Sequence, residues 1–560
     1  MRFSILCSTA AAVLLANPVA GLGMRSDLAK KLQLNAELGL NSNLLLKDYQ
    51  AFRTISTQAK VPVESVSLPI DHENPSLGTY QNRFWANDDY YRPGGPVFLY
   101  DAGETDAGSS SSHLVSNTSF FRAMMQEFNA IGIVWEHRYY GQSLPYPVTN
   151  NTTPEHLKYL TTRQALADIP SFARNFTRHG YPGIDLTPAS TPWVMVGGSY
   201  PGIRAALARS EYPDTIYASF ASSAPLQAQI DMSSYYTQVH RGMIANGAEN
   251  CAKDIHAALQ YIDEQLSHPK TAAALKQLFF GEGAENNSNE DFTAALGGIF
   301  GFFQTYGMEG GEGSLRDFCD HLATNSTTGL SAGPNGLAPL VGNKYLAERW
   351  AAWPVFVELV NLNFYTNCRG LDSSAALSCE LNNPPTTPSA IAWTWQYCSE
   401  WGFYQSSNTG VHSLLSKYQT LEFQQLQCNR LFPEALQSGI LPPEPQAVAH
   451  NTEYGGWTIR PSNVFFTSGE FDPWRTLTLL SKEEWAPQGI TVTSEIPQCG
   501  VRTAANTVFG YVGANEYHCF DFRADSAAGA EAREYFRRAL KEWLPCFAKE
   551  KLKLKLGMAA

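Results

Sequence analysis

Charged side chains are scarce in this 560-residue chain. Asp, Glu, Lys and Arg make up 16% of its residues, whereas an average soluble protein has about 25%. The 40 basic residues are outnumbered by 52 acidic ones, and a formal net charge of -12 argues against a general nucleic-acid binder, which needs a basic surface. Aromatic residues reach 12%, so the chain has enough apolar surface to form a core and should not be disordered.

Long hydrophobic runs are missing after the first residues. A basic start at Met1-Arg2, a short apolar run over 3–16 and small residues at 18–21 are typical of a secretory signal peptide, assigned here to residues 1–20. The run is shorter than the roughly 20 residues of a membrane anchor. We therefore expect a secreted, extracellular protein without a membrane span, with a vacuolar or lysosomal destination as the alternative.

Cysteine and histidine spacings typical of metal sites are also missing. No C-x-x-C pair occurs, so neither a structural zinc site nor any other metal or cofactor is predicted. Of the 10 cysteines, Cys7 falls in the signal peptide. In an oxidising compartment the others predict up to four disulfides and one free thiol, with the pairing left open.

Glycosylation sequons agree with a secretory route. The N-x-[ST] pattern occurs at Asn117, Asn150, Asn151, Asn175, Asn286 and Asn325. Asn150 and Asn151 are adjacent and are expected to compete for one glycan.

Between residues 95 and 225, short apolar runs alternate with amphipathic segments, which is typical of a mostly parallel sheet with crossover helices. Strands are predicted over 96–100, 131–135, 193–196 and 216–220. Helices broken by polar loops follow to about residue 450. Strands are then predicted at 463–467 and 490–494, and an amphipathic helix at 527–544.

This order predicts one α/β domain interrupted by a helical insertion. The expected parts are an N-terminal arm over 21–55, the first part of the α/β domain over 56–230, a helical cap over 231–455, the second part of the α/β domain over 456–548 and a solvated basic tail over 549–560.

The strongest local motif runs from Pro192 to Ala206. An apolar strand leads into Gly197-Gly198-Ser199, and a helix rich in small residues follows. Such a turn pushes the serine side chain out of the sheet, as in a nucleophile elbow. Pro201 stands where the G-x-S-x-G pattern has its last glycine; proline is tolerated near a helix start but biases the preceding residue away from helical angles. A purely structural turn is the other interpretation.

A serine nucleophile needs a histidine base and a carboxylate that orients the histidine. In folds with this elbow the chain order is Ser, acid, His, with the last two in loops after late strands. Asp472 follows the predicted strand 463–467, and His518 stands in a polar loop further on. Together with Ser199 they form a candidate triad.

Other residues suit these roles less well. Asp521 would have to fold back three residues onto His518. The side chain of Cys519 diverges from that of its neighbour, and a Cys-His pair is therefore unfavourable. His72 and His137 precede the serine, which is the wrong order.

With these segments placed, the chain resembles the S28 family of serine peptidases, the group of prolyl carboxypeptidase, dipeptidyl peptidase II and fungal acid prolyl endopeptidases. The resemblance rests on PIDH at 69–72, PGGPVFLY at 93–100, EHRYYGQS at 136–143, QALAD at 164–168, SSAP at 222–225, WQYCSEWGFYQ at 395–405 and DPW at 472–474. The chain departs from the family pattern at Pro201, where a small residue is usual, and at Tyr517, where the family has histidine.

The resemblance implies an α/β-hydrolase fold with a large, mostly helical cap inserted between nucleophile and acid, and cleavage of proline-containing peptides after proline. Ser199 would attack the carbonyl and His518, held by Asp472, would move the proton. The oxyanion would bind the backbone N–H of Tyr200 and that of Gly103 or Glu104.

A prolyl ring calls for a small apolar or aromatic pocket. Trp474, two residues after the acid, is the first candidate for its wall, and similarity to the family adds Trp401 and Ile203. Glu400 is a candidate contact for a substrate amine. Ordinary core packing of the two tryptophans and a structural ion pair of Glu400 are the alternatives.

The choice among carboxypeptidase, aminopeptidase and endopeptidase action stays open, as does homodimer formation. Acid activity is expected from the family and the pI of about 5.5, although an ordinary histidine is half protonated near pH 6.5. Competing hypotheses are an esterase or lipase on the same fold and a catalytically silent binding protein.

Overall fold

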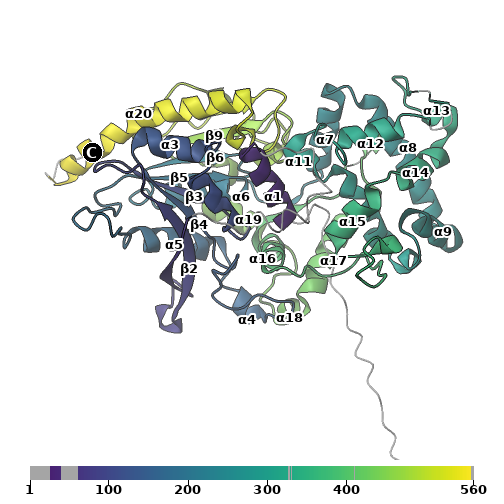
Figure 1. Cartoon of the computed structure of the whole chain (residues 1–560), viewed down its shortest axis with the longest axis horizontal. Helices are drawn as coiled ribbons and strands as arrows, with labels where there is room; N and C mark the ends of the chain where they lie inside the picture. Colours follow the sequence, from purple (N-terminus) through teal and green to yellow (C-terminus); the bar gives the residue numbers. More distant parts are fainter. Residues whose placement is uncertain (1–25, 40–60, 326–327, 330, 409, 556–560) are drawn as a thin grey trace, which may run out of the picture.

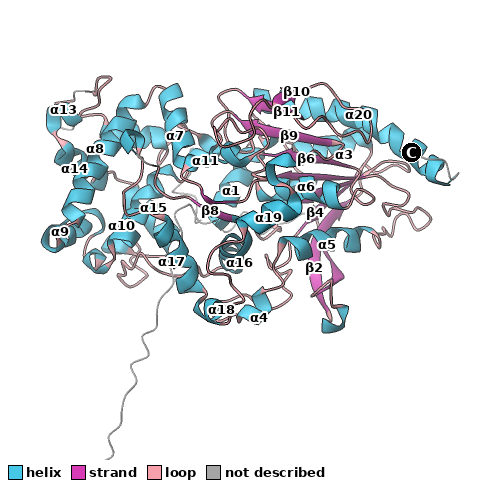
Figure 2. Ribbon diagram, turned by 180° about the vertical axis from the view of Figure 1, so that it is seen from behind, coloured by secondary structure: helices cyan, strands magenta, loops and turns pink. Residues whose placement is uncertain are grey.

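The computed structural model describes residues 26–39, 61–325, 328–329, 331–408 and 410–555. Figure 1 shows a sheet flanked by helices beside a body of many short helices, and Figure 2 shows the same two parts from behind. The predicted signal peptide lies outside the described residues. Of the predicted N-terminal arm, residues 26–39 are described, and they hold the helix α1 (Ser26–Glu37).

A sheet of nine strands organises the α/β domain, in the order β1-β2-β4-β3-β5-β6-β9-β11-β10. Its strands are β1 (Val63–Pro69), β2 (Thr79–Asn87), β3 (Val97–Asp101), β4 (Ile131–Trp135), β5 (Trp193–Gly198), β6 (Ala218–Ser222), β9 (Val464–Gly469), β10 (Thr491–Thr493) and β11 (Thr507–Gly513). β2 pairs antiparallel with β1 and β4, and the other pairs are parallel.

The predicted strands overlap β3, β4, β5, β6, β9 and β10. The first five are buried along their length, and strands covered on both faces read as apolar runs, whereas β10 is a partly exposed edge strand. β1, β2 and β11 were not predicted. Every second residue of β1 from Val63 to Ser67 is exposed, and such an edge strand lacks an apolar run. The helix predicted over 527–544 is longer in the structure: α20 runs Ala527–Lys555. The basic end is therefore helical as far as Lys555, where a solvated tail was expected.

Helices cover both faces of the sheet (Figures 1 and 2). α3 (Phe120–Phe128) and α20 pack on one face, where Phe536 of α20 lies 4.8 Å from Phe220 of β6, centroid to centroid. α5 (Thr162–Ala173) and α6 (Tyr200–Glu211) lie on the other face. Burying one such phenylalanine contributes roughly 1.5–3 kcal/mol, so the aromatic layers hold the helices to the sheet.

The predicted cap, 231–455, is built from short helices. They are α7 (Ser234–Ala245), α8 (Glu249–Leu266), α9 (Pro269–Phe280), α10 (Asn289–Leu296), α11 (Phe303–Tyr306), α12 (Leu315–Leu322), α13 (Ala338–Val341), α14 (Asn343–Ala351), α15 (Phe356–Phe364), α16 (Pro388–Gln396), α17 (Leu421–Leu431), α18 (Pro433–Gln437) and α19 (Ala447–Tyr454). A parallel pair, β7 (Gln229–Asp231) and β8 (Gly402–Tyr404), connects the start of the insertion with the segment between α16 and α17. Together the sheet and this insertion form an α/β-hydrolase fold with a helical cap.

The described residues contain four disulfides and one free thiol, which agrees with the predicted limit of four disulfides and one free thiol. Three pairs lie within the cap and one in the α/β domain; they are Cys251–Cys319, Cys368–Cys379, Cys398–Cys428 and Cys499–Cys546. Cys519 is free and buried. Burial raises the pKa of its thiol well above the ordinary value, so it stays protonated and is a poor nucleophile.

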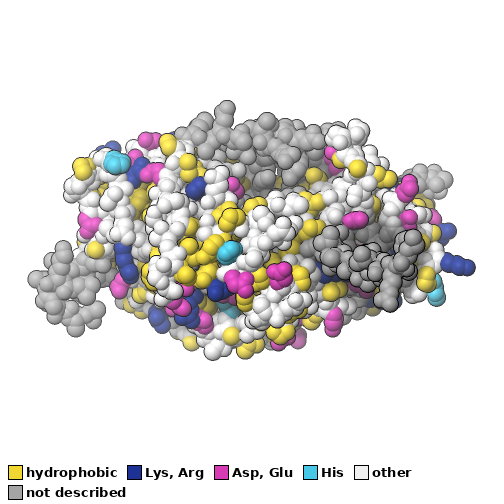
Figure 3. Space-filling model, turned by 90° about the horizontal axis from the view of Figure 1, so that it is seen from below, with side chains coloured by type: hydrophobic (Ala, Val, Ile, Leu, Met, Phe, Trp, Pro, Cys, Tyr) yellow, Lys and Arg dark blue, Asp and Glu magenta, His cyan; other side chains and the backbone are white. Residues whose placement is uncertain are grey.

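The surface carries the remaining sequence features. Among the predicted glycosylation sites, Asn325 is half-buried and the other five are exposed. On the face in Figure 3, charged side chains of both signs are scattered among apolar and uncharged ones. Within the described ranges, no helix has the length and apolar character needed to cross a membrane.

Candidate active site

The three candidate triad residues follow three parallel strands of the sheet. Ser199 comes directly after β5, Asp472 follows β9 and His518 follows β11. Because the carboxyl ends of parallel strands lie at one edge of the sheet, the topology brings these loops together.

Ser199 occupies a tight turn between β5 and α6. Its φ of 69° and ψ of -132° are rare for a residue with a side chain, and its N–H donates to the Ser222 carbonyl at 2.9 Å. A Cβ at Gly197 would come within 2.2 Å of the Pro201 carbonyl oxygen, so only glycine fits there. Helix α6 begins at Tyr200 despite the proline that follows it. The local geometry is therefore that of a nucleophile elbow.

Asp472 and His518 contact each other directly. His518 Nδ1 lies 2.9 Å from Asp472 Oδ1 and 3.0 Å from Oδ2, and both side chains are buried. Asp472 Oδ1 also accepts the Trp474 N–H at 2.9 Å, which orients the carboxylate. His518 Nε2 is buried and has no hydrogen-bond partner among the described residues. The imidazole is thus oriented by a carboxylate at one nitrogen and available at the other.

The alternative acid, Asp521, lies in a different environment. Its carboxylate accepts the hydroxyls of Ser222 and Thr467, on the neighbouring strands β6 and β9. Burial raises its pKa to about 6 although these hydrogen bonds act against the shift. Asp521 therefore ties the histidine loop to the sheet, and the carboxylate that reaches His518 belongs to Asp472.

A cavity of about 190 Å³ opens beside Ser199, between the sheet edge and the cap. Ile203 and Trp474, two of the candidate pocket residues, line it together with the cap residue Phe403, whose ring lies 5.2 Å from that of Trp474. The Trp474 indole N–H donates to Gln304 Oε1 at 2.8 Å. One wall of the cavity is thus aromatic, and the Trp474 side chain is fixed by the hydrogen bond that it donates to the cap.

Trp401 lies one layer behind this wall. It is fully buried, and its ring contacts Phe403 at 5.6 Å and Tyr200 at 5.9 Å, both of which line the cavity. It supports the wall from outside the cavity.

Glu400 also points away from the cavity. Its carboxylate accepts the backbone N–H of Thr162 at 2.9 Å and the Thr162 hydroxyl at 2.7 Å. Thr162 is the first residue of α5, so the contact joins the cap to a helix N-terminus of the α/β domain. Burial raises the pKa of Glu400 to about 7, against the effect of these hydrogen bonds.

The predicted oxyanion loop follows β3 and packs against the elbow. A Cβ at Gly103, whose φ is 65°, would lie 2.2 Å from the Pro201 ring, so the proline packs closely on this loop. The Gly103 N–H already donates to Asp101 Oδ1 at 3.0 Å. The Glu104 side chain lines the cavity with Ser199.

A buried polar network surrounds the hydroxyl of Tyr200, the residue after Ser199. The Tyr200 hydroxyl lies 3.0 Å from His137 Nε2 and accepts the Gln396 side-chain N–H at 2.7 Å, which links the elbow to α16 of the cap. Burial lowers the pKa of His137 well below its ordinary value, and the charge of Arg204 adds to this effect. His137 is therefore neutral and serves as a hydrogen-bonding partner of Tyr200.

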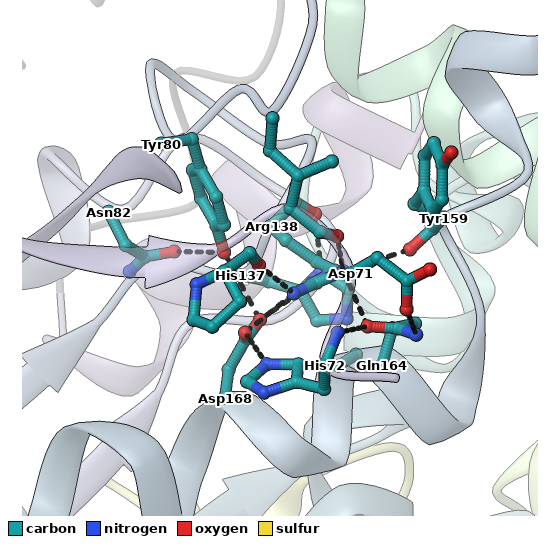
Figure 4. Close-up of polar contacts among 12 residues, drawn as sticks. Asp71, His72, Tyr80, Asn82, His137, Arg138, Tyr159, Gln164 and Asp168 are labelled. Carbon is teal, nitrogen blue, oxygen red and sulfur yellow. Dashed lines mark hydrogen bonds and ion pairs between the residues drawn. The ribbon is translucent and has the colours of Figure 1, made fainter. Parts of the chain in front are cut away.

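Figure 4 shows how the neighbouring Arg138 is held. Its guanidinium donates to Asp168 at 2.7 Å through both Nε and Nη2, and His72 Nε2 contacts the same carboxylate at 2.7 Å. Burial alone would raise the pKa of Asp168, but the ion pair with Arg138 outweighs it and sets the pKa at about 2. Through Arg138, the motif 136–143 is thus joined to Asp168 of α5 and, through Asp168, to His72.

Sequence reasoning missed several residues that line the cavity. The cap contributes Gln304, Phe403 and Tyr235, and helix α1 contributes Lys30 and Gln33. No local motif marks them, because they reach the cavity only through tertiary packing. Within the part of the chain that the structure describes, no group of three His, Cys, Asp or Glu side chains is arranged to hold a metal ion.

Comparison with known proteins adds independent information. The family model described as "Serine carboxypeptidase S28" matches residues 69–494. The chain is 27% identical to the "Probable extracellular serine carboxypeptidase" of Arthroderma benhamiae, over 79% of this chain and only 62% of that protein's length. It is 28% identical to the "Thymus-specific serine protease" of Mus musculus, over 85% of this chain and 86% of that protein. Among solved structures, it is similar to a proline iminopeptidase of Mycobacterium smegmatis at 11% identity and a TM-score of 0.33, over 88% of this chain and 100% of that one.

Proposed function

Because the chain belongs to the serine carboxypeptidase S28 family, we propose that it is a secreted serine peptidase that hydrolyses peptide bonds after proline. The observation that carries the proposal is the contact between Asp472 and His518 at the sheet edge that also holds the strained Ser199 turn. A serine elbow combined with an imidazole that a carboxylate orients is the arrangement that nucleophilic acyl transfer needs.

In the proposed reaction, Ser199 Oγ attacks the carbonyl carbon of the prolyl residue while His518 Nε2 takes the hydroxyl proton. The tetrahedral intermediate then collapses, the C–N bond breaks, and His518 returns the proton to the leaving amine. Water attacks the resulting acyl-enzyme in the same way and releases the carboxylate product. Asp472 holds the Nδ1–H and stabilises the imidazolium that forms at each step.

For the oxyanion we propose the backbone N–H groups of Tyr200 and Glu104. Tyr200 is the first residue of α6, where the N–H has no acceptor within the helix. Gly103 is less suitable because its N–H already binds Asp101. Each donor in such a site is worth about a hundredfold to a thousandfold in turnover.

For the prolyl ring we propose the aromatic part of the cavity. Trp474 and Phe403 stand edge to face at 5.2 Å, and Ile203 lies on the elbow helix beside Ser199. A rigid apolar ring without an N–H fits a wall of aromatic and aliphatic side chains, since no hydrogen-bonding group of the protein is left unpaired. Secretion is supported by the four disulfides and by the exposed sequons.

The test is product mapping by mass spectrometry on one long peptide with internal prolines, offered with free and with blocked ends. We expect cleavage after proline, and the positions cut will distinguish exopeptidase from endopeptidase action. Ser199→Ala should lower kcat by about a millionfold and abolish labelling by a fluorophosphonate. Turnover of simple esters with no cleavage of prolyl peptides would instead indicate an esterase.

Ser219→Ala is the matched control for this variant. Ser219 is buried on β6, and its hydroxyl has no hydrogen-bond partner among the described residues. The same chemical change should therefore leave activity and labelling intact. Full prolyl peptidase activity in Ser199→Ala would contradict the proposed mechanism.

A further inference from the structure

Helix α1 lies between the α/β domain and the cap (Figure 1). Its Glu37 accepts the Tyr100 hydroxyl at 3.0 Å on the sheet side, and its Leu32 carbonyl accepts the Tyr306 hydroxyl at 3.2 Å on the cap side. Lys30 and Gln33 of this helix line the cavity that also contains Ser199. A segment of the chain itself thus forms part of the cleft.

Lys30 is placed in the cleft against the carboxylate of Glu104. The Lys30 ammonium lies 3.1 Å from Glu104 Oε1, and the Glu104 side chain is only 8% exposed. Among the described residues, the second oxygen, Oε2, is buried without a hydrogen-bond partner. The guanidinium of Arg204 forms its ion pair with another carboxylate, since its Nη1 lies 2.5 Å from Asp101 Oδ2.

A buried carboxylate with one unpaired oxygen is destabilised relative to one that is fully paired. Such a group favours any cation that reaches it with better geometry than the one it already has. Exchange of one ammonium for another leaves the charge of the site unchanged, so no second charge has to be desolvated alone.

We propose that Glu104 is a specificity residue of the cleft, whose carboxylate receives a cationic group of the peptide substrate, with Lys30 occupying its place in the resting chain. The cation is an N-terminal ammonium or a lysine or arginine side chain, which share the chemistry of a charged N–H donor. The inference rests on the proposed peptidase function. It assigns to Glu104 the role that the sequence alone suggested for Glu400, which is engaged by Thr162 instead.

The test uses three prolyl peptides of one sequence: free at the N-terminus, acetylated, and acetylated with an added lysine. Glu104→Gln keeps the backbone N–H and the side-chain volume but removes the charge. We expect the ratio of kcat/KM for the free peptide over the acetylated one to fall about tenfold to hundredfold, the range for loss of a charge-assisted hydrogen bond. The lysine peptide shows whether a side chain serves as the cation. An unchanged ratio for both cationic peptides overturns the proposal.

Asp106→Asn is the matched control, because Asp106 is a carboxylate on the same loop with a side chain 55% exposed, outside the cavity lining. In this control, the kcat/KM ratio of each cationic peptide over the acetylated one should stay as in the unmodified chain.

Lys30→Met should change these kcat/KM ratios in the opposite direction. We expect them to rise severalfold, because the competing ammonium is gone while Glu37 and the Thr118 contact to Leu38 still hold α1. A ratio that does not rise contradicts the exchange of Lys30 for substrate.

A binding measurement tests the role of Glu104 separately from the proposed peptidase activity. Calorimetric titration of the same peptides into Ser199→Ala requires no turnover. Tighter binding of a cationic peptide that is lost in Ser199→Ala/Glu104→Gln supports the role of Glu104 even if no prolyl bond is cut. Equal binding of cationic and acetylated peptides overturns it even if the chain proves to be a prolyl peptidase.

Discussion

The two parts of the molecule that meet at the cavity hold their side chains in place by different means. In the α/β domain, Ser199, Asp472 and His518 lie in loops that follow strands of the sheet. The backbone hydrogen bonds between these strands fix the positions from which the loops start. In the cap, Gln304 and Phe403 stand on or beside short helices, and three of the four disulfides lie there. The sheet edge thus fixes the proposed catalytic residues, whereas packing and disulfides fix the walls of the cavity.

The sharpest way to test the sheet side is Asp472→Asn. The amide would turn an N–H toward His518 Nδ1 and favour the tautomer that cannot accept the serine proton. We expect kcat to fall about ten-thousandfold with little change in thermal unfolding, measured on a prolyl peptide and by circular dichroism.

Asp521→Asn is the control for this variant, since Asp521 is the other buried carboxylate near the histidine and binds Ser222 and Thr467 instead. Its effect on kcat should be far smaller. A comparable loss in both variants would contradict the assignment of Asp472 as the orienting acid.

On the cap side, Cys251→Ala with Cys319→Ala removes a crosslink that spans 68 residues. The free energy of unfolding should fall by about 4 kcal/mol, because the unfolded chain gains conformational freedom. A looser cap should also raise KM severalfold while kcat changes little, as measured by denaturant unfolding and steady-state kinetics.

The Cys499–Cys546 pair, with a separation of 47, offers the comparison within the α/β domain. Its removal should lower stability to a similar extent and leave KM unchanged. If removal of either disulfide raises KM equally, the disulfides of the cap do not hold the cavity walls in place.

The smallest expected effect lies at the joint between the two parts, at Glu400. A folded-state pKa of about 7 lies above the ordinary 4.5, so this group's contribution to stability is complete below pH 4.5 and is lost as pH rises through 7. Glu400→Gln lacks this dependence. Its Tm relative to the unmodified chain should therefore rise by about 2 °C between pH 5 and pH 8.

Glu348→Gln, an exposed carboxylate paired with Lys344 and distant from Glu400 in the chain, is the control for the pH series. Its Tm difference from the unmodified chain should be the same at both pH values. If the Tm difference of Glu400→Gln from the unmodified chain is also the same at pH 5 and pH 8, the buried carboxylate does not titrate in this range.

The elbow and the buried strands were readable in the sequence because their signals are local. Gly197-Gly198-Ser199 between an apolar strand and a helix is a contiguous pattern, and β3 to β6 are continuous apolar runs. The placement of Trp401 was not readable, since a tryptophan of the cap packs equally well in or behind a wall. Its full burial follows from tertiary contacts with Tyr200 of α6, with Phe403 and with His450 of α19.

What the sequence determined by itself is the alternation of buried strands with helices, the elbow, and a limit of four disulfides with one free thiol. Backbone preferences and apolar periodicity act over a few residues and need no partner. The tertiary structure decided which cysteines pair, which carboxylate reaches His518, where Glu400 binds and which carboxylate faces the cavity. Those choices depend on contacts between residues far apart in the chain, such as Lys30 and Glu104, and packing of the whole fold selects among partners that the sequence leaves equivalent.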